Sequence, residues 1–474
     1  MYNRYIFAGL FISSVVFAGD YEDWLRQQSN SFTSYKKSMD EEFANMLKKD
    51  WEAFSQMYNP SPYVKPKPVE IPKIEPKKLD SKELENSKIV KPVIKTSIVP
   101  PIQKPKIVQP KVTIPQIGID YFGSKLSFNY TQKMKQDIYK ISKQTIVKYW
   151  EDISKVDTTT LLEQIKQTKS NFNLNDWGLY QLVNKISSAI ASSHNETNLL
   201  NWYLLTKLGF DCKVGYNASN VYLISTTNEN LYQVAFFKLD GKKYYVLTPE
   251  GKIDSVGKIF TYNGHYPKAN QKVSMKIAKP FLTNDQFIQR DLSFKYDGKT
   301  YTIATKFNKY LVDFYKTYPQ SSYEIYYENS NSPILTTTIL KQLGKIVENK
   351  TELEAVNILL RFVQTAFAYK TDDQQFAYEK VMFAEETLFY PYSDCEDRSI
   401  MFSYLVRNIL GLDVVGVKFS DHMAAAVSFS SAVFGDSFNY KGKKFVMADP
   451  TYINANTGVT MPQYKGKKFE VIGL

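Results

Sequence analysis

The sequence predicts an α+β protein made of two related units, in which helices pack on antiparallel sheets. Segments of one half reappear in the other: LGFDCKVGY at 208–216 matches LGLDVVGV at 410–417, and GKKYYVLTPE at 241–250 matches GKKFVMADPT at 442–451. The two pairs are offset by 202 and 201 residues. In each copy a helical pattern precedes runs rich in β-branched residues, which is typical of strands.

The second copy shows the expected elements most clearly. Ile400, Met401, Tyr404 and Leu405 follow helical spacing, and Gly411 is placed to end that helix. The runs DVVGVKF, HMAAAVSF and KKFVMAD that follow are typical of three strands. Each unit is therefore expected to be a helical layer against an antiparallel sheet.

A third match sets the expected boundaries of the units. KLSFNY at 125–130 resembles DLSFKY at 291–296, an offset of 166 residues. Because the later matches are offset by 202, we expect about 36 additional residues before the helix of the second copy. The units are predicted at 117–286 and 287–474.

Residues 1–18 have the pattern of an export signal. Arg4 precedes an apolar stretch from Tyr5 to Phe17, and small residues at the −3 and −1 positions predict cleavage after Ala18. The apolar run is short for a membrane span, although an uncleaved anchor remains an alternative. We expect an exported protein, periplasmic or at the cell surface.

Residues 19–58 carry apolar side chains at intervals of eleven. An eleven-residue period corresponds to 3.67 residues per turn, so it predicts one stripe along an amphipathic helix. We expect the stripe to form a coiled coil with another copy or to bind an envelope partner, and docking on the protein's own globular part is the alternative. The two series are Tyr21, Phe32, Phe43, Phe54 and Trp24, Tyr35, Met46, Met57.

Residues 59–116 are predicted to be a linker. They hold 12 of the 20 prolines and 12 Lys against five acidic residues, so much of the formal net charge of +12 lies here. Proline favours an extended polyproline conformation. We therefore interpret the charge as a basic tether and expect no nucleic-acid groove.

Two cysteines occur, and their surroundings differ. Cys212 lies in a probable strand, where a free buried cysteine is common, so we expect no disulfide. Cys395 lies where YPYSD becomes a helix, which Ser393 or Asp394 can cap. A thiol at a helix start is expected to have a lowered pKa, because the helix dipole and unpaired amides favour the thiolate.

Only three histidines are available as a base for this thiol. His422 lies 27 residues after Cys395, at the head of one predicted strand, and Asp449 lies 27 residues after His422, at the end of another. Neighbouring antiparallel strands would place the imidazole between the thiol and the carboxylate. From spacing alone, a surface histidine and a turn-forming Asp-Pro pair remain alternatives.

These motifs together resemble the transglutaminase-like superfamily of bacterial cysteine peptidases and acyltransferases. The matching stretches are FAEETLFYP, SDCEDRSIMFSYLVRNILGL, DHMAAAV and FVMADPTY, within about 355–452. The resemblance implies two papain-like domains and a Cys–His–Asp triad of Cys395, His422 and Asp449 that works through an acyl-thioester. Ser393 departs from the family, because many members have glycine there.

The resemblance also implies an oxyanion hole made by the backbone amide of the cysteine and a second donor. We take Tyr392 as the candidate donor, and simple packing of the loop by Tyr392 stays open. Asp397 and Arg398 are expected to form an internal ion pair that fixes the start of the helix. Asp394 is expected to be structural.

The first copy lacks the three side chains of the expected triad. The offsets place Ser193 opposite Cys395, Asn220 (or Val221) opposite His422, and Thr248 opposite Asp449. None of these side chains serves as thiolate, imidazole base or carboxylate. We expect a degenerate repeat that kept the fold.

These observations predict an exported, cysteine-dependent hydrolase of amide or isopeptide bonds in a peptide or envelope substrate. A protein-crosslinking transamidase and a non-catalytic tethered scaffold are the alternatives. Since no Cys–His metal spacing and no glycine-rich phosphate loop occur in the sequence, no metal or cofactor is expected.

Overall fold

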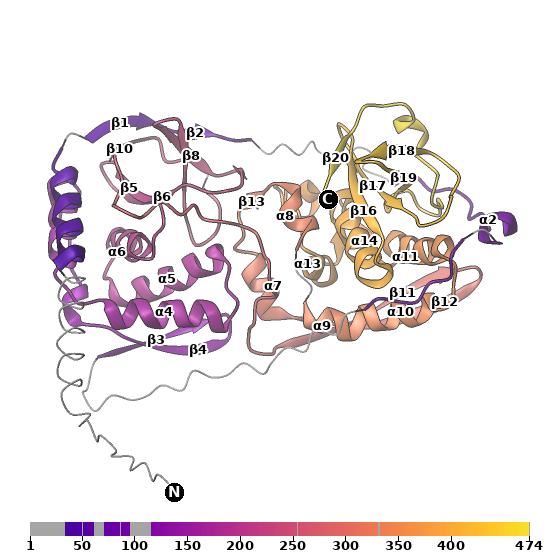
Figure 1. The fold of residues 1–474 in the computed structure, drawn as a ribbon, viewed down its shortest axis with the longest axis horizontal. Helices are drawn as coiled ribbons and strands as arrows, with labels where there is room; N and C mark the ends of the chain where they lie inside the picture. The colour runs from indigo at the N-terminus through magenta and orange to yellow at the C-terminus, as the bar shows by residue number, and fades with distance from the viewer. Residues whose placement is uncertain are drawn as a thin grey trace, which may run out of the picture.

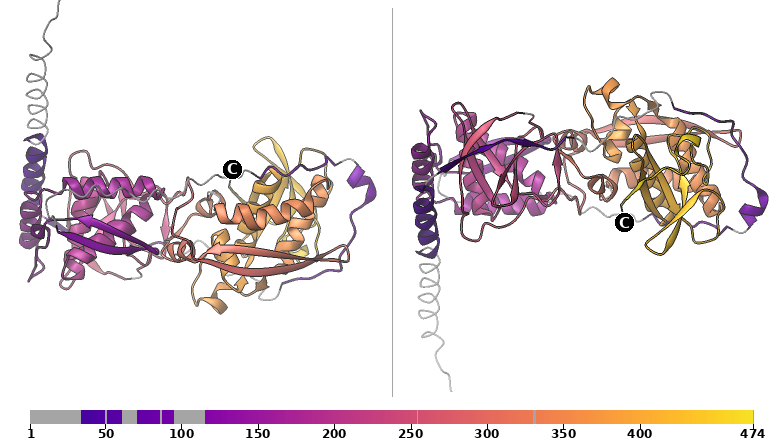
Figure 2. Two further views of the ribbon diagram at one scale, coloured as in Figure 1. Left: turned by 90° about the horizontal axis from the view of Figure 1, so that it is seen from below. Right: turned by 90° about the horizontal axis from the view of Figure 1, so that it is seen from above.

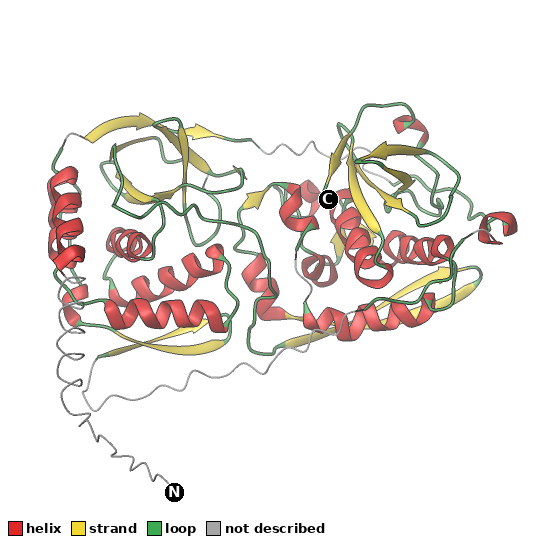
Figure 3. Cartoon of the chain, in the orientation of Figure 1, coloured by secondary structure: helices red, strands yellow, loops and turns green. Residues whose placement is uncertain are grey.

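Two units of helix and sheet lie side by side (Figure 1). The computed structural model describes residues 34–49, 51–60, 71–85, 87–94, 115–253, 255–329 and 332–473. In each unit a layer of helices lies between a curled sheet and a two-stranded hairpin (Figure 3). The predicted α+β class is confirmed. The predicted export signal, with residues 19–33, lies outside the described residues.

The first unit begins with a hairpin and four helices that support its sheet. The hairpin is β3 (Gln116–Tyr121) and β4 (Ser124–Asn129), followed by η1 (Gln132–Met134), α3 (Lys143–Ile153), α4 (Thr159–Asn171), α5 (Asp176–Ile190) and α6 (His194–Lys207). Its later strands are β5 (Cys212–Tyr216), β6 (Val221–Ser225), β7 (Leu231–Tyr232), β8 (Ala235–Leu239), β9 (Lys242–Val246) and β10 (Lys258–Tyr262).

The second unit repeats this order with more helices. Its hairpin is β11 (Phe287–Tyr296) and β12 (Lys299–Asn308), and its first helical segments are α7 (Lys309–Tyr315), α8 (Tyr323–Tyr327), α9 (Pro333–Leu335), η2 (Thr336–Leu340), α10 (Lys341–Val347) and α11 (Glu352–Ala366), with β13 (Gln320–Ser321) among them. Then come β14 (Ala368–Tyr369), α12 (Asp372–Gln375), α13 (Ala384–Phe389), β15 (Tyr392–Ser393) and α14 (Cys395–Leu410). The last elements are β16 (Asp413–Lys418), β17 (Met423–Ser428), β18 (Ser437–Tyr440), β19 (Lys443–Ala448), η3 (Pro462–Tyr464) and β20 (Glu470–Ile472).

The two sheets share strand order and register. The order β10-β5-β6-β9-β8 in the first unit matches β20-β16-β17-β19-β18 in the second. The pair Cys212↔Ser225 corresponds to Val414↔Val427 at an offset of 202. Likewise, Phe237↔Tyr244 corresponds to Phe438↔Phe445 at an offset of 201. Since backbone pairing reproduces the offsets read from the sequence, the two units share one architecture.

The third sequence match was wrong. KLSFNY falls on the second strand of its hairpin, β4, whereas DLSFKY falls on the first strand of the other hairpin, β11. The turns themselves correspond, because Phe122-Gly123 and Asp297-Gly298 both have positive φ. The expected 36 additional residues are wrong as well. The connection between α5 and α6 is 191–193, whereas between α11 and α14 it is 367–394.

The N-terminal segment docks on the first unit (Figure 2). Residues 34–47 are helical, and Phe43 and Leu47 are buried in the first unit's core. The Phe43 ring lies 4.6 Å from that of Trp150 and 5.4 Å from that of Tyr266. The expectation that this part of the stripe is free for a partner was therefore wrong, because the aromatic core of the first unit covers it.

The predicted helix also ends earlier than position 58. Residues after 50 form β1 (Trp51–Ser55) and β2 (Met57–Tyr58), which pair with β10 and β8, the two edges of the first sheet. The indigo strands crossing that sheet in Figure 1 are these two. The apolar residues of this stretch therefore belong to strands and not to a helical stripe. Phe54 packs against the apolar cluster inside the curled sheet.

Part of the predicted linker binds the second unit. Ile74 and Ile453 are joined by a backbone hydrogen bond of 3.1 Å, and Val90 donates to Lys350 O at 2.7 Å. The short helix α2 (Ser81–Glu85) lies between these contacts. A free tether is therefore wrong for residues 71–85 and 87–94. Proline does not prevent this docking, because an extended segment still offers carbonyls and the remaining amides.

Aromatic side chains join the two units. β7 of the first unit pairs with β13 of the second, and the Trp177 ring lies 6.1 Å from that of Tyr318. Trp177 donates through Nε1 to Thr317 Oγ1 at 3.1 Å. Among the helices in the described part of the chain, none has the length and apolar character needed to cross a bilayer.

Candidate functional site

Cys395 is the first residue of α14, and the surrounding elements fix its position. The residue before the helix, Asp394, is extended, and Gly411 ends the helix in the left-handed conformation with φ 69°. Ser399 Oγ donates to Ala424 O at 2.8 Å, which ties the first turn of α14 to β17. The sulfur accepts a hydrogen bond from the backbone N–H of Met423, next to His422. The helix start and the head of β17 therefore meet at the thiol.

His422 and Asp449 are brought together by the sheet. They stand just outside β17 and β19, whose register includes Ala425↔Ala448. Nε2 of His422 lies 2.8 Å from Oδ2 of Asp449, and both side chains are buried. Because a carboxylate only accepts hydrogen bonds, Nε2 carries the proton. Nδ1 is then the ring nitrogen left to act as a base.

Asp449 is held by its own loop and by α11. Its Oδ1 accepts from the backbone N–H of Thr451 at 2.9 Å and of Tyr452 at 3.2 Å. Gln364 Nε2 donates to the carbonyls of Asp449, Tyr452 and Ala455, within 3.0 Å of each. Sequence reasoning missed Gln364, since nothing in the local pattern of α11 distinguishes it from a surface glutamine.

The electrostatic surroundings of the thiol differ from the expectation. Burial, followed by the carboxylates of Glu396 and Asp394, raises the pKa of the Cys395 thiol well above its ordinary value. Sγ donates to Glu396 Oε2 at 3.0 Å. The predicted lowering of this pKa was therefore wrong for this state, because burial and the nearby carboxylates outweigh the helix dipole.

Four buried acidic side chains surround the helix start: Asp372, Asp394, Glu396 and Asp397. Burial, with Glu396 next, raises the pKa of Asp397 to about 7. Burial, with the neighbouring carboxylates next, raises the pKa values of Asp372 and Asp394 well above their ordinary range. Sequence reasoning missed the cluster because Asp372 comes from α12, far from Cys395 along the chain.

This cluster has the donor chemistry of a hard-cation site. Asp372, Asp394 and Glu396 each offer one oxygen, and these oxygens lie within 4.8 Å of one another. Within the described ranges, the Asp394 carboxylate receives no hydrogen bond. Carboxylate oxygens suit Ca²⁺ or Mg²⁺. The expectation that no metal binds rested on Cys and His spacing, which does not register a site made of carboxylates.

The predicted ion pair between Asp397 and Arg398 is not formed. Asp397 accepts from the backbone N–H of Met382 at 2.8 Å and of Asp394 at 3.3 Å. The Arg398 guanidinium donates to Phe367 O at 2.7 Å and to Ser393 Oγ at 3.2 Å. Burial lowers the pKa of Arg398 to about 10. Asp397 and Arg398 therefore both hold the backbone around the helix start. They do so through bonds to other groups and not to each other.

Two tyrosines bear on the candidate site. Tyr392, the expected oxyanion donor, is on β15, and Lys370 Nζ lies 3.9 Å from its ring centroid. The Tyr464 ring stacks on His422, with centroids 4.8 Å apart and an interplanar angle of 17°. Tyr464 was not predicted, because it lies on η3, in a loop with no strand pattern. It covers one face of the catalytic candidate His422.

The equivalent positions of the first unit have structural roles. Ser193 caps α6 by accepting from Glu196 N–H at 3.3 Å. Asn220 Nδ2 donates to Tyr222 Oη at 3.2 Å, and Thr248 Oγ1 donates to Lys252 O at 3.0 Å. Both cysteines are free thiols, and burial raises the pKa of Cys212 to about 12.

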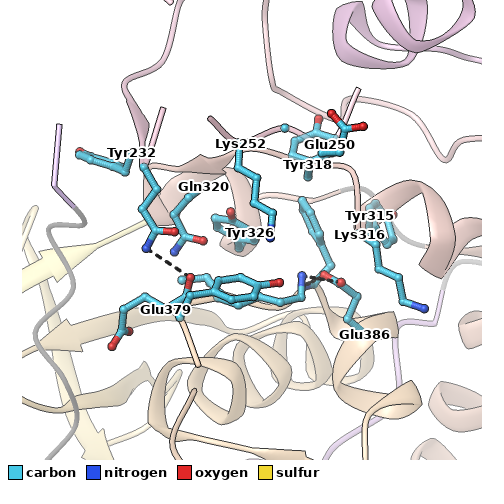
Figure 4. Close-up of a pocket in the computed structure, with 16 residues that line it drawn as sticks. Tyr232, Glu250, Lys252, Tyr315, Lys316, Tyr318, Gln320, Tyr326, Glu379 and Glu386 are labelled. Carbon is cyan, nitrogen blue, oxygen red and sulfur yellow. Dashed lines mark hydrogen bonds and ion pairs between the residues drawn. The ribbon is translucent and has the colours of Figure 1, made fainter. Parts of the chain in front are cut away.

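A separate small pocket of about 50 Å³ lies at the junction of the units (Figure 4). Tyr232 and Lys252 of the first unit face Tyr326 and Glu379 of the second across it. Lys380 and Glu386, which also line the pocket, form a buried ion pair of 2.7 Å. Cys395, His422 and Asp449 do not line this pocket, which belongs to the interface of the units.

Comparisons of the chain with protein-family models, with curated proteins and with solved structures found no match.

Proposed function

We propose that the chain is an exported, cysteine-dependent hydrolase of amide or isopeptide bonds, related to the transglutaminase-like superfamily. The observation that supports this most directly is the 2.8 Å contact between His422 Nε2 and Asp449 Oδ2, beside a cysteine at a helix start. The sequence motifs and the shared order of Cys, His and Asp agree with it. The export signal is a prediction from residues 1–18.

In the proposed reaction, His422 Nδ1 takes the proton from Cys395 Sγ as the sulfur attacks the carbonyl carbon of the substrate. The S–C bond forms, and the carbonyl electron pair moves to oxygen. The backbone amide of Cys395 and a second donor, for which Tyr392 is our candidate, stabilise that oxyanion. The C–N bond then breaks, and the leaving amine takes the proton from His422.

Water completes the proposed cycle. His422 removes a proton from water as its oxygen attacks the thioester, the S–C bond breaks, and the proton returns to Cys395. The carboxylic acid is released and the thiol is restored. Asp449 stabilises the protonated imidazole throughout and holds its orientation. An amine in place of water gives transamidation.

The raised pKa of Cys395 bears on how attack begins. The resting thiol donates to Glu396, so the proposed mechanism uses proton transfer to His422 during attack. A stored thiolate is not required.

The test is trapping of the acyl-enzyme. The full chain is treated with p-nitrophenyl acetate, and acetylated peptides are located by mass spectrometry. We expect an acetyl group on Cys395, absent after His422→Ala, with Cys212 as the unmodified internal control. Products formed with an added primary amine distinguish hydrolysis from transfer. An unmodified Cys395 in the folded wild-type chain contradicts the proposal.

A further inference from the structure

The two sheets differ at their edges. In the first unit, the outer edges of β10 and β8 are both paired, with β1 and β2 of the N-terminal segment. In the second unit the equivalent edges are β20 and β18, and neither has a further strand partner among the described residues. An unpaired edge presents a row of backbone donors and acceptors to an extended polypeptide.

The side chains beneath these edges differ in the same way. Phe237 and Ile259 are fully buried in the first unit, in the apolar cluster that Phe54 of β1 packs against. The positions that correspond by strand register are Phe438 and Phe469. Phe469 is 39% exposed and Phe438 is half-buried. The second sheet thus keeps an apolar interior but lacks the strand that covers it in the first.

These exposed rings are continuous with the candidate active site. The Phe438 and Phe469 rings lie 4.8 Å apart, and Phe469 lies 5.8 Å from Phe419. Phe419 in turn lies 4.7 Å from Tyr464, the residue that stacks on His422. β20 also pairs Glu470 with Lys418, the last residue before Phe419. A segment bound at this edge would therefore run close to His422.

The rim of the open edge is cationic. The sequence YKGKKF occurs twice, at 440–445 and 464–469, and places exposed lysines on the β18–β19 turn and just before β20. Lys443 pairs with Asp413 and Lys465 with Asp436, while Lys467 and Lys468 are exposed beside Phe469. Such a rim favours acidic residues in whatever binds there.

We propose that the open edge formed by β18, β20, Phe438 and Phe469 binds an extended acidic segment of the substrate protein as an added strand. The sister unit supplies the precedent, because β1 and β2 pair with the equivalent edges of its sheet. β-Strand addition derives its affinity from main-chain hydrogen bonds and its specificity from alternate side chains. That the bound segment belongs to a substrate rests on the proposed function.

The probe is a fluorescein-labelled peptide with the sequence of residues 49–60, KDWEAFSQMYNP, and a second with Ser55→Glu. Binding to the full-length Cys395→Ala chain is followed by fluorescence anisotropy. We expect saturable binding, tighter for the more acidic peptide. An Ala53→Pro peptide, which lacks one amide donor, should bind at least about tenfold more weakly.

A matched pair of variants locates the site. Phe469→Ser should weaken binding about tenfold or more, whereas Phe260→Ser, on the already paired β10, should leave it unchanged. Hydrogen exchange should show new protection at 437–440 and 470–472. Absence of saturable binding, equal binding to Phe469→Ser, or protection at 258–262 through displacement of β1 would each overturn the proposal.

The outcomes of the binding assay and of the acylation assay are independent of each other. Binding is measured without the nucleophile, so loss of acylation at Cys395 with intact peptide binding rejects the proposed function alone. Acylation of Cys395 without peptide binding rejects the open edge as a docking site alone.

Discussion

The first and second units share a strand order and a register, yet at the corresponding positions only the second has a thiol, an imidazole and a carboxylate, in Cys395, His422 and Asp449. The largest difference between them precedes α14, the helix that begins at Cys395. Residues 191–193 connect α5 to α6, whereas 367–394 connect α11 to α14 and supply Asp372, Tyr392 and Asp394. Backbone pairing thus preserves the fold, while a few side chains and one insertion create the candidate site.

The largest expected effect is at the carboxylate position. Asp449→Asn should reduce acylation of Cys395 about 10³-fold or more, because the amide no longer stabilises the charged imidazole or fixes its tautomer. Thr248→Val, at the equivalent position of the first unit, should leave the rate unchanged. Rates are measured by release of p-nitrophenol. Similar losses for both variants would remove the contrast between the units.

Docking of the N-terminal helix on the first unit predicts the next effect. Phe43→Ala should lower the free energy of unfolding by about 3–5 kcal/mol, since the ring is 2% exposed among Trp150, Tyr262 and Tyr266. Tyr35→Ala, at a residue 47% exposed, should cost less than about 1 kcal/mol. Chemical denaturation of the full chain measures both. Equal costs would mean that the helix does not dock as described.

The acidic cluster of the second unit predicts a pH dependence of stability. Because folding raises the pKa of Asp397 to about 7 and those of Asp372 and Asp394 as well, the folded state binds more protons than the unfolded state between about pH 4 and 7. Stability should therefore fall as pH rises through this window, at about 2–4 °C in Tm per kcal/mol lost.

Asp394→Asn should flatten that dependence, whereas Asp285→Asn, an exposed control, should not. Ca²⁺ added at about pH 8 should recover part of the loss in the wild type and none in Asp394→Asn. Scanning calorimetry at several pH values measures these differences. A wild-type Tm that rises steadily from pH 4 to 7 would contradict the assigned burial of the carboxylates.

The smallest effect concerns the resting thiol. Glu396→Gln removes the carboxylate that accepts from Cys395 Sγ, so the thiol pKa should fall and alkylation near pH 7.5 should rise roughly tenfold, the equivalent of about one pKa unit. Iodoacetamide labelling with mass spectrometry measures the rate, and the Cys212 peptide is the internal standard. An unchanged alkylation rate would mean that a group other than Glu396 raises the pKa of the thiol.

Local pattern determined much of this protein from its sequence. Helical spacing and Gly411 predicted α14 and its end, β-branched runs predicted the strands, and the offsets of 202 and 201 anticipated the shared register. The positions of Cys395, His422 and Asp449 at the ends of elements were also readable, since helix starts and strand ends are marked by nearby residues. The KLSFNY match misled because six residues do not specify which strand of a hairpin they form.

Contacts between distant segments decided the rest. Whether Phe43 faces a partner or Trp150, and whether residues 71–94 are free, depends on surfaces that no local periodicity describes. The thiol pKa is set by burial and by carboxylates, and Asp372, which raises the pKa of Asp394, arrives from another element. Electrostatic energies depend on distance and desolvation in three dimensions, so only the tertiary structure fixes them. The open edge beside His422 likewise depends on tertiary structure, because β1 and β2 pair with the first sheet and not, among the described residues, with the second.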